Sequence, residues 1–428
     1  MRFPVLPWLG VALLVCAGPS AAAEESTAST ASAEPSTATS ANVRLAVEWI
    51  GAARFVERAD PGIDPANALG MPRWSGSTEL RPNLRVESGA WQLVARPRLL
   101  LSGSRATREG APALVRRTAT ASWTEAFVTW RPADALAVSA GRQNFQWGPA
   151  ELLAPSNRLF HESGLFRDPL YLVRGKDMLR VNVSLGRQWS LVALADLHDS
   201  GDGAFVARAP FRPTGLAKFE YTSADGASYA GLVAGRRSGV RSWIGEYAAL
   251  TLSDAWTVYL DAAQERGSDA WVPAGMPPVF TQARAGERDL RGTTLAGVRW
   301  TLPRGDEWRL EAVHQAAGWT RGEIERAPLA AVLDPAPLLA PGLEFAGRDL
   351  VLLAVRVPDL PPRKRTQVSV RYLHSVTDGS GVLFATAAWE AADAWVVFGS
   401  ATWTRGPAWA EFSRLVRTAV LGGVVRTW

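Results

Sequence analysis

Apolar and polar residues alternate along most of this chain with a period of two, which is the period of a β-strand. In the clearest stretch, 74–87, Leu80 belongs to the apolar set of alternate positions and Glu79 to the polar set. The same division recurs at 179–185 and at 367–372. No helical periodicity persists for three turns. The pattern therefore predicts strands with one apolar and one polar face.

Strand length and loop length together indicate a membrane barrel. Between Val43 and Trp428 there are about 18 such segments of about nine to twelve residues, the length that a tilted strand needs to cross a bilayer. Soluble strands average about five or six residues. Short connections are expected at 88–90, 131–134, 186–188, 223–227, 253–255, 303–307, 358–365 and 391–394, and most connections between them are long, including 56–73, 143–175, 200–213, 266–288 and 320–347. Short periplasmic turns and long outer loops are typical of outer-membrane barrels. We expect an all-β fold, a closed antiparallel transmembrane β-barrel of 16 to 18 strands over 43–428.

Tryptophan supports the same interpretation, because many of the 19 tryptophans lie beside the short connections. Amphipathic rings collect at the membrane interface. The predicted periplasmic girdle consists of Trp91, Trp130, Trp189, Trp256, Trp300, Trp308, Trp389 and Trp395. Burial of these rings in a soluble core would place them at strand centres instead.

The first 42 residues have a different composition. Arg2, the apolar run 3–17 and three alanines at 21–23 have the pattern of a secretory signal peptide, 1–23. Residues 24–42 are rich in Ser, Thr, Ala and Glu and predict a disordered periplasmic tail. The only cysteine, Cys16, lies in this leader, so the mature chain is expected to contain no disulfide and no thiolate metal site. Mass spectrometry of the native protein should find a mature chain that begins near Glu24.

Two short segments resemble known families. The chain ends on Trp428, and a terminal aromatic residue resembles the signature by which bacterial outer-membrane barrels are recognised for insertion, although Arg426 stands where those barrels usually have an apolar residue. The segment 141–151, with Ser156 and Asn157, is similar to the strand-to-loop stretch of porin-like families, the alginate-export type among them. The resemblance implies a porin or an exporter in the outer membrane of a Gram-negative bacterium, with outer-membrane lipid and the barrel-assembly machinery as partners.

The connection 143–175 is the candidate constriction loop. It follows the fifth expected strand, and in general porins the third loop folds into the lumen there. Its length far exceeds the usual four to six residues. Its charged candidates are Arg158, His161, Glu162, Arg167, Asp168, Arg174 and Lys176. A surface loop packed on its neighbours is the alternative.

The polar face of the strands supplies the candidate pore lining. By alternation, this face carries Arg81, Arg85, Arg96, Arg98, Glu125, Arg180, Arg299, Arg309, Glu311 and Arg371. Arginine outnumbers carboxylate among them, and rings of arginine favour anions. At least half of these residues are expected to pair across strands and to stiffen the wall.

The sequence gives little indication of nucleic-acid binding, metal or cofactor binding, or catalysis. The net charge of +5 is spread along the chain and does not form one basic patch, so nucleic acid is not an expected partner. No metal spacing or phosphate loop is present, and no cofactor is expected. Asp196 and His198 share one face of a strand as a possible acid and base of a barrel enzyme, the least favoured alternative.

The sequence therefore predicts an outer-membrane channel for small hydrophilic, anionic solutes or an acidic polysaccharide. A plugged barrel for surface assembly or attachment of polysaccharide is the main alternative. The sequence leaves the oligomeric state open.

Overall fold

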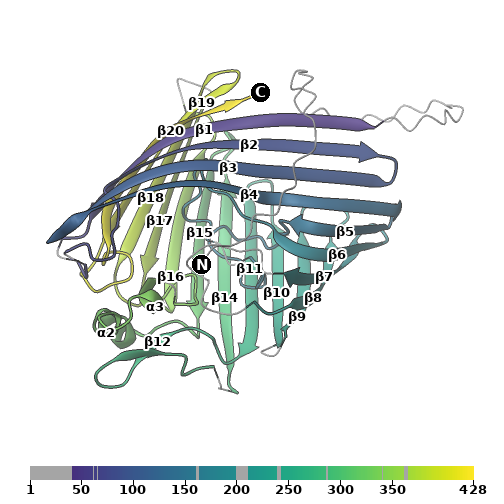
Figure 1. Ribbon diagram of the computed structural model, residues 1–428. Coiled ribbons are helices and arrows are strands. Elements are labelled where there is room, and N and C mark those ends of the chain that lie inside the picture. Colours follow the sequence, from purple (N-terminus) through teal and green to yellow (C-terminus); the bar gives the residue numbers. More distant parts are fainter. Residues whose placement is uncertain are drawn as a thin grey trace, which may run out of the picture.

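The computed structural model describes residues 41–60, 62–64, 66–160, 163–198, 211–238, 242–285, 288–339, 341–360 and 365–428. The expected leader and nearly all of the expected tail lie outside these residues. Eighteen strands form one sheet that closes on itself, because β1 pairs with β20 as well as with β2 (Figure 1). The predicted closed antiparallel barrel is confirmed.

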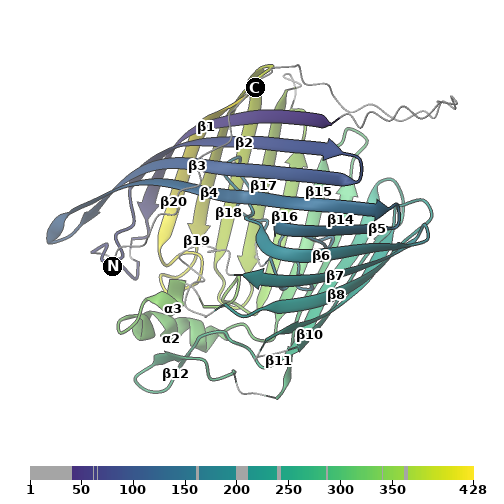
Figure 2. The same cartoon turned by 45° about the vertical axis from the view of Figure 1, so that its right-hand side comes forward.

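The barrel strands follow one another around the wall in chain order. They are β1 (Asn42–Arg58), β2 (Trp74–Ser88), β3 (Trp91–Arg108), β4 (Ala111–Ala133), β5 (Leu136–Gln143), β6 (Lys176–Leu185), β7 (Trp189–His198), β8 (Thr214–Thr222), β9 (Tyr229–Arg237), β10 (Ser242–Thr251), β11 (Trp256–Arg266), β14 (Leu290–Thr301), β15 (Glu307–Gln315), β16 (Asp349–Val357), β17 (Thr366–Ser375), β18 (Gly381–Ala392), β19 (Trp395–Arg405) and β20 (Val416–Thr427). Strand length is less uniform than expected. It ranges from 8 residues in β5 to 23 in β4, and the β3–β4 hairpin extends past its neighbours (Figure 2).

The outer loops contain the remaining regular structure. The hairpin of β12 (Val272–Ala274) and β13 (Val279–Thr281) packs against α2 (Arg321–Ala331), which is followed by α3 (Ala336–Leu339). Helix α2 was not expected from the sequence, although Thr320 and Glu323 form a capping box at its start. No helix in the described part of the chain is long and apolar enough to cross a membrane.

Neighbouring outer loops are also tied together by a partly buried carboxylate. Glu411, in the connection 406–415, accepts the backbone N–H groups of Ala346 (2.6 Å) and Gly347 (2.9 Å). Burial raises the pKa of this carboxyl group, and the nearby Arg414 opposes that shift.

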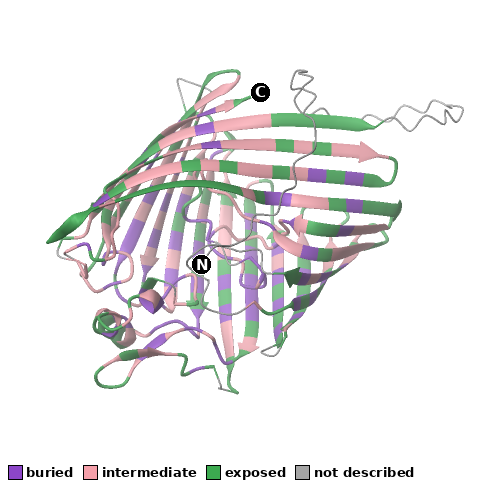
Figure 3. Ribbon diagram, viewed as in Figure 1, coloured by how far each residue is buried: buried purple, intermediate pink, exposed green. Residues whose placement is uncertain are grey.

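Strand pleating separates two faces along every strand, and buried and exposed positions alternate along β7 to β11 (Figure 3). On β10, for example, Trp243, Tyr247 and Ala249 are buried inside the barrel, whereas Ile244 and Leu250 are exposed outside it. The alternation observed in the sequence therefore records which face each side chain occupies.

The eight tryptophans of the expected girdle lie at the rim with the short turns, and seven of them are between 38% and 55% exposed. Cross-strand pairs stack there, with ring centroids 6.0 Å apart for Trp91 and Trp130 and 5.5 Å apart for Trp256 and Trp300. Arg426 lies at the same rim, 5.1 Å from the ring of Trp395 and 4.6 Å from that of Trp428. Cation–π contact with two rings accounts for a charged residue at this position. That the girdle lies in the membrane interface stays a prediction.

Candidate functional site

The connection between β5 and β6, residues 144–175, is called loop L3 here. It contacts inward-facing side chains on distant parts of the wall. Arg158 of L3 lies 3.5 Å from Glu265 on β11, and Glu151 accepts a hydrogen bond of 2.5 Å from Arg371 on β17. Near its other end, the carbonyls of Pro169 and Leu170 accept hydrogen bonds of 3.2 Å from Arg81 on β2. L3 therefore extends across the interior of the barrel (Figure 1).

A buried carboxylate on β15 holds the middle of L3. Glu311 is fully buried and accepts the backbone N–H groups of Glu151 (2.7 Å) and Leu152 (2.8 Å). The hydroxyl of Tyr259 donates to the same carboxylate at 2.7 Å. Charge-assisted bonds of this kind are stronger than neutral ones, and breaking a buried network leaves groups without partners.

A second buried carboxylate, Asp261 on β11, holds the next turn of L3. It accepts the backbone N–H of Ser156 at 2.7 Å, and the side chain of Ser156 in turn accepts the indole N–H of Trp147 at 3.1 Å. Gly148 has φ +102, and a Cβ there would lie 2.3 Å from the Asp261 carboxylate. Glycine is therefore required at the point where L3 comes closest to β11. Trp147, Gly148 and Ser156 belong to the segment whose sequence is similar to porin-like families.

Apolar contacts fix the rest of the loop. Trp147, Leu159 and Phe160 pack on inward residues of β6 to β10 that include Met178, Leu216 and Trp243. Leu152, Leu153 and Leu165 pack on β14, β16 and β17, where Leu295, Leu352 and Leu373 lie. Burial of this many apolar side chains gives L3 a defined position.

A glycine on β14 makes the Glu311 network possible. Gly297 is the cross-strand partner of Tyr259, and a Cβ at Gly297 would lie 2.4 Å from the tyrosine ring. We expect Gly297→Ala to displace this ring from Glu311 and to lower the thermal unfolding temperature of the barrel. Gly103→Ala, where a Cβ meets nothing within 4 Å, is the matched control. Equal unfolding temperatures for the two variants would contradict this interpretation.

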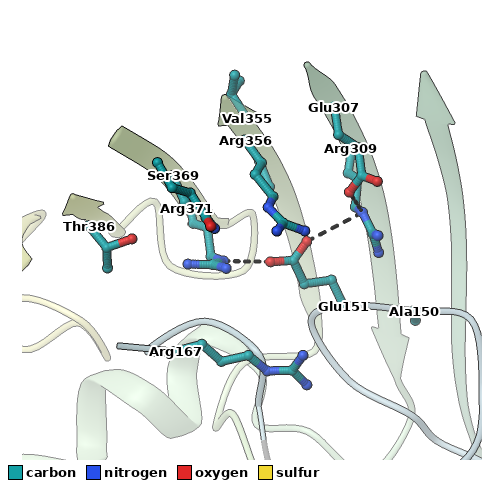
Figure 4. Close-up of a pocket in the computed structure, with 12 residues that line it drawn as sticks. Ala150, Glu151, Arg167, Glu307, Arg309, Val355, Arg356, Ser369, Arg371 and Thr386 are labelled. Atoms are coloured by element: carbon teal, nitrogen blue, oxygen red, sulfur yellow. Dashed lines mark hydrogen bonds and ion pairs between the residues drawn. The ribbon is translucent and has the colours of Figure 1, made fainter. Parts of the chain in front are cut away.

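A cavity of about 340 Å³ lies between L3 and the strands β15 to β18 (Figure 4). Four arginines line it, Arg167 from L3 and Arg309, Arg356 and Arg371 from the wall, together with two carboxylates, Glu151 and Glu307. The remaining lining is Ala150, Ala354, Val355, Gln367, Ser369 and Thr386. The wall residues belong mainly to the strand halves next to the short turns, so the cavity lies on the short-turn side of L3.

Glu151 forms ion pairs with two of these arginines. Its carboxylate lies 2.5 Å from Arg371 and 3.4 Å from Arg309, and Arg309 also bonds Glu307 at 2.6 Å. Among the described residues, Arg167 and Arg356 have no carboxylate partner, and Nη1 of the largely buried Arg371 has no hydrogen-bond partner. The cavity therefore has more positive charge than its own carboxylates neutralise.

The inward-facing arginines of β2 and β3 are paired with acidic residues. Buried Glu79 accepts hydrogen bonds from Arg98 at 2.5 and 2.8 Å and also contacts Arg81. Further pairs join Arg85 to Glu87 at 2.7 Å and Arg96 to Glu125. These arginines face the interior, as alternation predicts, but each has an acidic partner.

The remaining candidates for the pore lining and the constriction loop lie apart from one another. Arg299 faces inward 3.9 Å from Glu307, and Arg180 covers the ring of Phe145 at 4.5 Å. Lys176 lies 5.9 Å from the ring of Phe160, and Asp168 accepts the backbone N–H groups of Leu170 and Tyr171. Arg174 is half-buried near the end of L3. His161 and Glu162 lie outside the described residues.

Sequence reasoning missed Arg356, Glu151 and Glu307 as members of this site. Arg356 follows a nearly unbroken apolar run in β16, so the only signal was its position two residues after the inward-facing Ala354.

The prediction that Asp196 and His198 share one face of β7 was wrong. A bulge next to Asp177 places His198 outside the barrel, 3.3 Å from Asp177, whereas Asp196 is buried inside. Among the described residues, no three His, Cys, Asp or Glu side chains form a metal site.

No protein-family model matches the sequence, and no curated protein matches it. Solved structures do share the fold. OprD of Pseudomonas aeruginosa superposes with a TM-score of 0.52 at 11% identity, over 90% of this chain and 95% of that chain. OccAB1 of Acinetobacter baumannii gives 0.57 at 10% identity, over 91% and 96%. A BenF-like porin of Pseudomonas fluorescens gives 0.52 at 11% identity, over 91% and 98%. These structural neighbours are outer-membrane porins of Gram-negative bacteria and are not enzymes, and the chain has their fold.

Proposed function

We propose that this protein is an outer-membrane channel that passes small hydrophilic anions, with the arginine-lined cavity beneath L3 as its selective region. The observation that carries the proposal is the charge of that cavity, four arginines against two carboxylates. The planar guanidinium group binds carboxylate or phosphate with two parallel hydrogen bonds. An anion that enters would meet Arg167 and Arg356 without having to displace a protein carboxylate.

The position of L3 supports a narrow passage. Charges that face a narrow, partly dehydrated space interact at an effective dielectric well below that of water. At a dielectric of about 20, one uncompensated charge about 8 Å from a permeating ion contributes about 2 kcal/mol, which corresponds to roughly a thirtyfold preference. Two unpaired arginines therefore suffice for measurable anion selectivity.

The breadth of the L3 contacts favours a second candidate function. L3 is bonded to β2, β11, β15 and β17 and packs on the strands between them. A loop held on so many sides fits a largely plugged barrel that serves surface assembly or attachment of polysaccharide. Both functions use the same wall and differ only in whether solutes pass L3.

Conductance in a planar bilayer separates the two candidates. The channel predicts discrete conductance steps and, in a potassium chloride gradient, a zero-current potential of the sign for chloride preference. Deleting most of L3 should raise the single-channel conductance. An acidic oligosaccharide that blocks the current from one side would favour the polysaccharide as substrate. Absence of conductance in the intact protein, with conductance restored by the deletion, would favour the plugged barrel and contradict our proposal.

A further inference from the structure

A group of arginines on the outside of the barrel has no part in the proposed channel. Arg105 on β3 is the cross-strand partner of Trp74, and Arg117 on β4 is the partner of Gly103. Both positions belong to the outward-facing set of their strands, and both side chains are exposed. Arg73 precedes Trp74 in the chain, and its guanidinium lies 5.4 Å from the ring of Phe55, which in turn contacts the ring of Trp74. These three arginines are called the outer arginine patch.

The patch lies just beyond the apolar part of the outer wall. Going up β3 from the girdle residue Trp91, outward positions hold apolar residues such as Leu99 and Leu101 before Arg105 is reached. Arg105 is about 14 residues from Trp91, which at about 3.3 Å per residue and a tilt of about 40° corresponds to a height of roughly 35 Å. The apolar band of such barrels is about 25 Å tall. The patch is therefore at the level of the lipid headgroups of the outer leaflet.

The aromatic neighbours of the patch also fit a membrane interface. Trp74 is 59% exposed and its ring lies 4.7 Å from that of Phe55. Exposed aromatic rings of this kind mark the boundary between the acyl chains and the headgroups. The ring of Trp74 can contact acyl chains while Arg105 beside it reaches a headgroup.

The charge of the patch is available to a ligand. Among the described residues, neither Arg105 nor Arg117 takes part in an ion pair or a hydrogen bond through its side chain. The two are diagonal neighbours across adjacent strands, a geometry that separates side chains by about 7–8 Å. Within the described part of the chain, neither Glu57 at the end of β1 nor Glu109 in the β3–β4 turn forms an ion pair with these arginines. Exposed outward-facing arginines occur at the outer ends of other strands too, at Arg236, Arg266 and Arg405.

We propose that the outer arginine patch, built by Arg73, Arg105 and Arg117, binds the phosphate group of an outer-leaflet lipid headgroup. Arginine forks bind phosphate oxygens in pairs, and cations beside a membrane attract anionic lipids. The proposal depends on the barrel being in an outer membrane and is independent of the solute that it passes.

The test compares lipid binding by the purified full-length barrel and by two variants. The probe is a fluorescent lipid A that carries its two phosphates, with dephosphorylated lipid A as the uncharged control. We expect Arg105→Gln combined with Arg117→Gln to weaken binding of the phosphorylated probe by about tenfold or more. Arg116→Gln is the matched control, because Arg116 is adjacent in the chain but pairs with the inward-facing Ser104. It should bind like the unmodified protein.

Three results would overturn the proposal. They are equal binding of the dephosphorylated lipid, equal loss in the Arg116→Gln control, and unchanged binding in the double variant. Displacement of the lipid by millimolar inorganic phosphate would indicate a site for the free ion in place of a lipid. Equal thermal unfolding temperatures show that the variants are folded. Single-channel conductance, measured in parallel, keeps this test separate from that of the proposed channel.

Discussion

Replacing Arg167 and Arg356 together with glutamate should convert the channel from anion to cation preference. The six charged residues that line the cavity carry a net charge of about +2, and the two substitutions change it to about −2. Because neither arginine has a carboxylate partner among the described residues, the substitutions should break no ion pair there. The zero-current potential in a potassium chloride gradient should therefore change sign.

The control for this experiment makes the same change of charge away from the cavity. Arg116→Glu combined with Arg131→Glu alters one residue in the β3–β4 hairpin region and one at a short turn, neither of which lines the cavity. This variant should keep the original sign of the potential. If the cavity variant also keeps it, ions do not pass these arginines, and the plugged barrel becomes the better interpretation.

Replacing Glu311 with alanine should release L3 from the wall. The substitution leaves the backbone N–H groups of Glu151 and Leu152 and the hydroxyl of Tyr259 without their shared acceptor. Loss of a buried charged acceptor of this kind costs about 3–5 kcal/mol. We expect a higher and noisier single-channel conductance, a lower unfolding temperature, and faster hydrogen exchange at the amides of 151 and 152.

Two further variants make this result specific to the loop anchor. Glu311→Gln keeps one acceptor oxygen and should give a smaller effect than Glu311→Ala. Glu87→Ala removes an inward-facing carboxylate whose partners are Arg85 and Gln92, with no bond to L3. It should leave conductance noise and the exchange of the L3 amides unchanged. If Glu311→Ala does the same, apolar packing alone holds L3.

The fold could be predicted from the sequence because the pattern that specifies it is local. Each strand carries its own alternation, so Glu79 and Leu80 are assigned to opposite faces without knowledge of any partner. The alternation of loop lengths and the tryptophans beside the short turns predict which rim of the barrel faces the periplasm. Helix α2 escaped because its pattern is short and weakly amphipathic, and only the capping box at Thr320 marked it.

The candidate site could be predicted only in part. Alternation placed Arg309 and Arg371 on the inner face, and loop length singled out L3. Neither pattern reveals that Glu151 bridges these two arginines, since Glu151 and Arg371 are 220 residues apart in the sequence. His198 was misassigned because a bulge of one residue reverses the face of every position that follows it.

The sequence by itself therefore determined the barrel and the face of nearly every strand residue, because a pleated strand repeats every two residues whatever lies beside it. Only the tertiary structure decided which arginines are neutralised. Arg81 and Arg98 meet Glu79 through strand register, whereas Arg356 and Arg167 have no carboxylate partner in the described part of the chain, where L3 crosses the interior. The path of L3 depends on Asp261 and Glu311, more than 100 residues further along the chain, and contacts of that separation leave no periodic trace in the sequence.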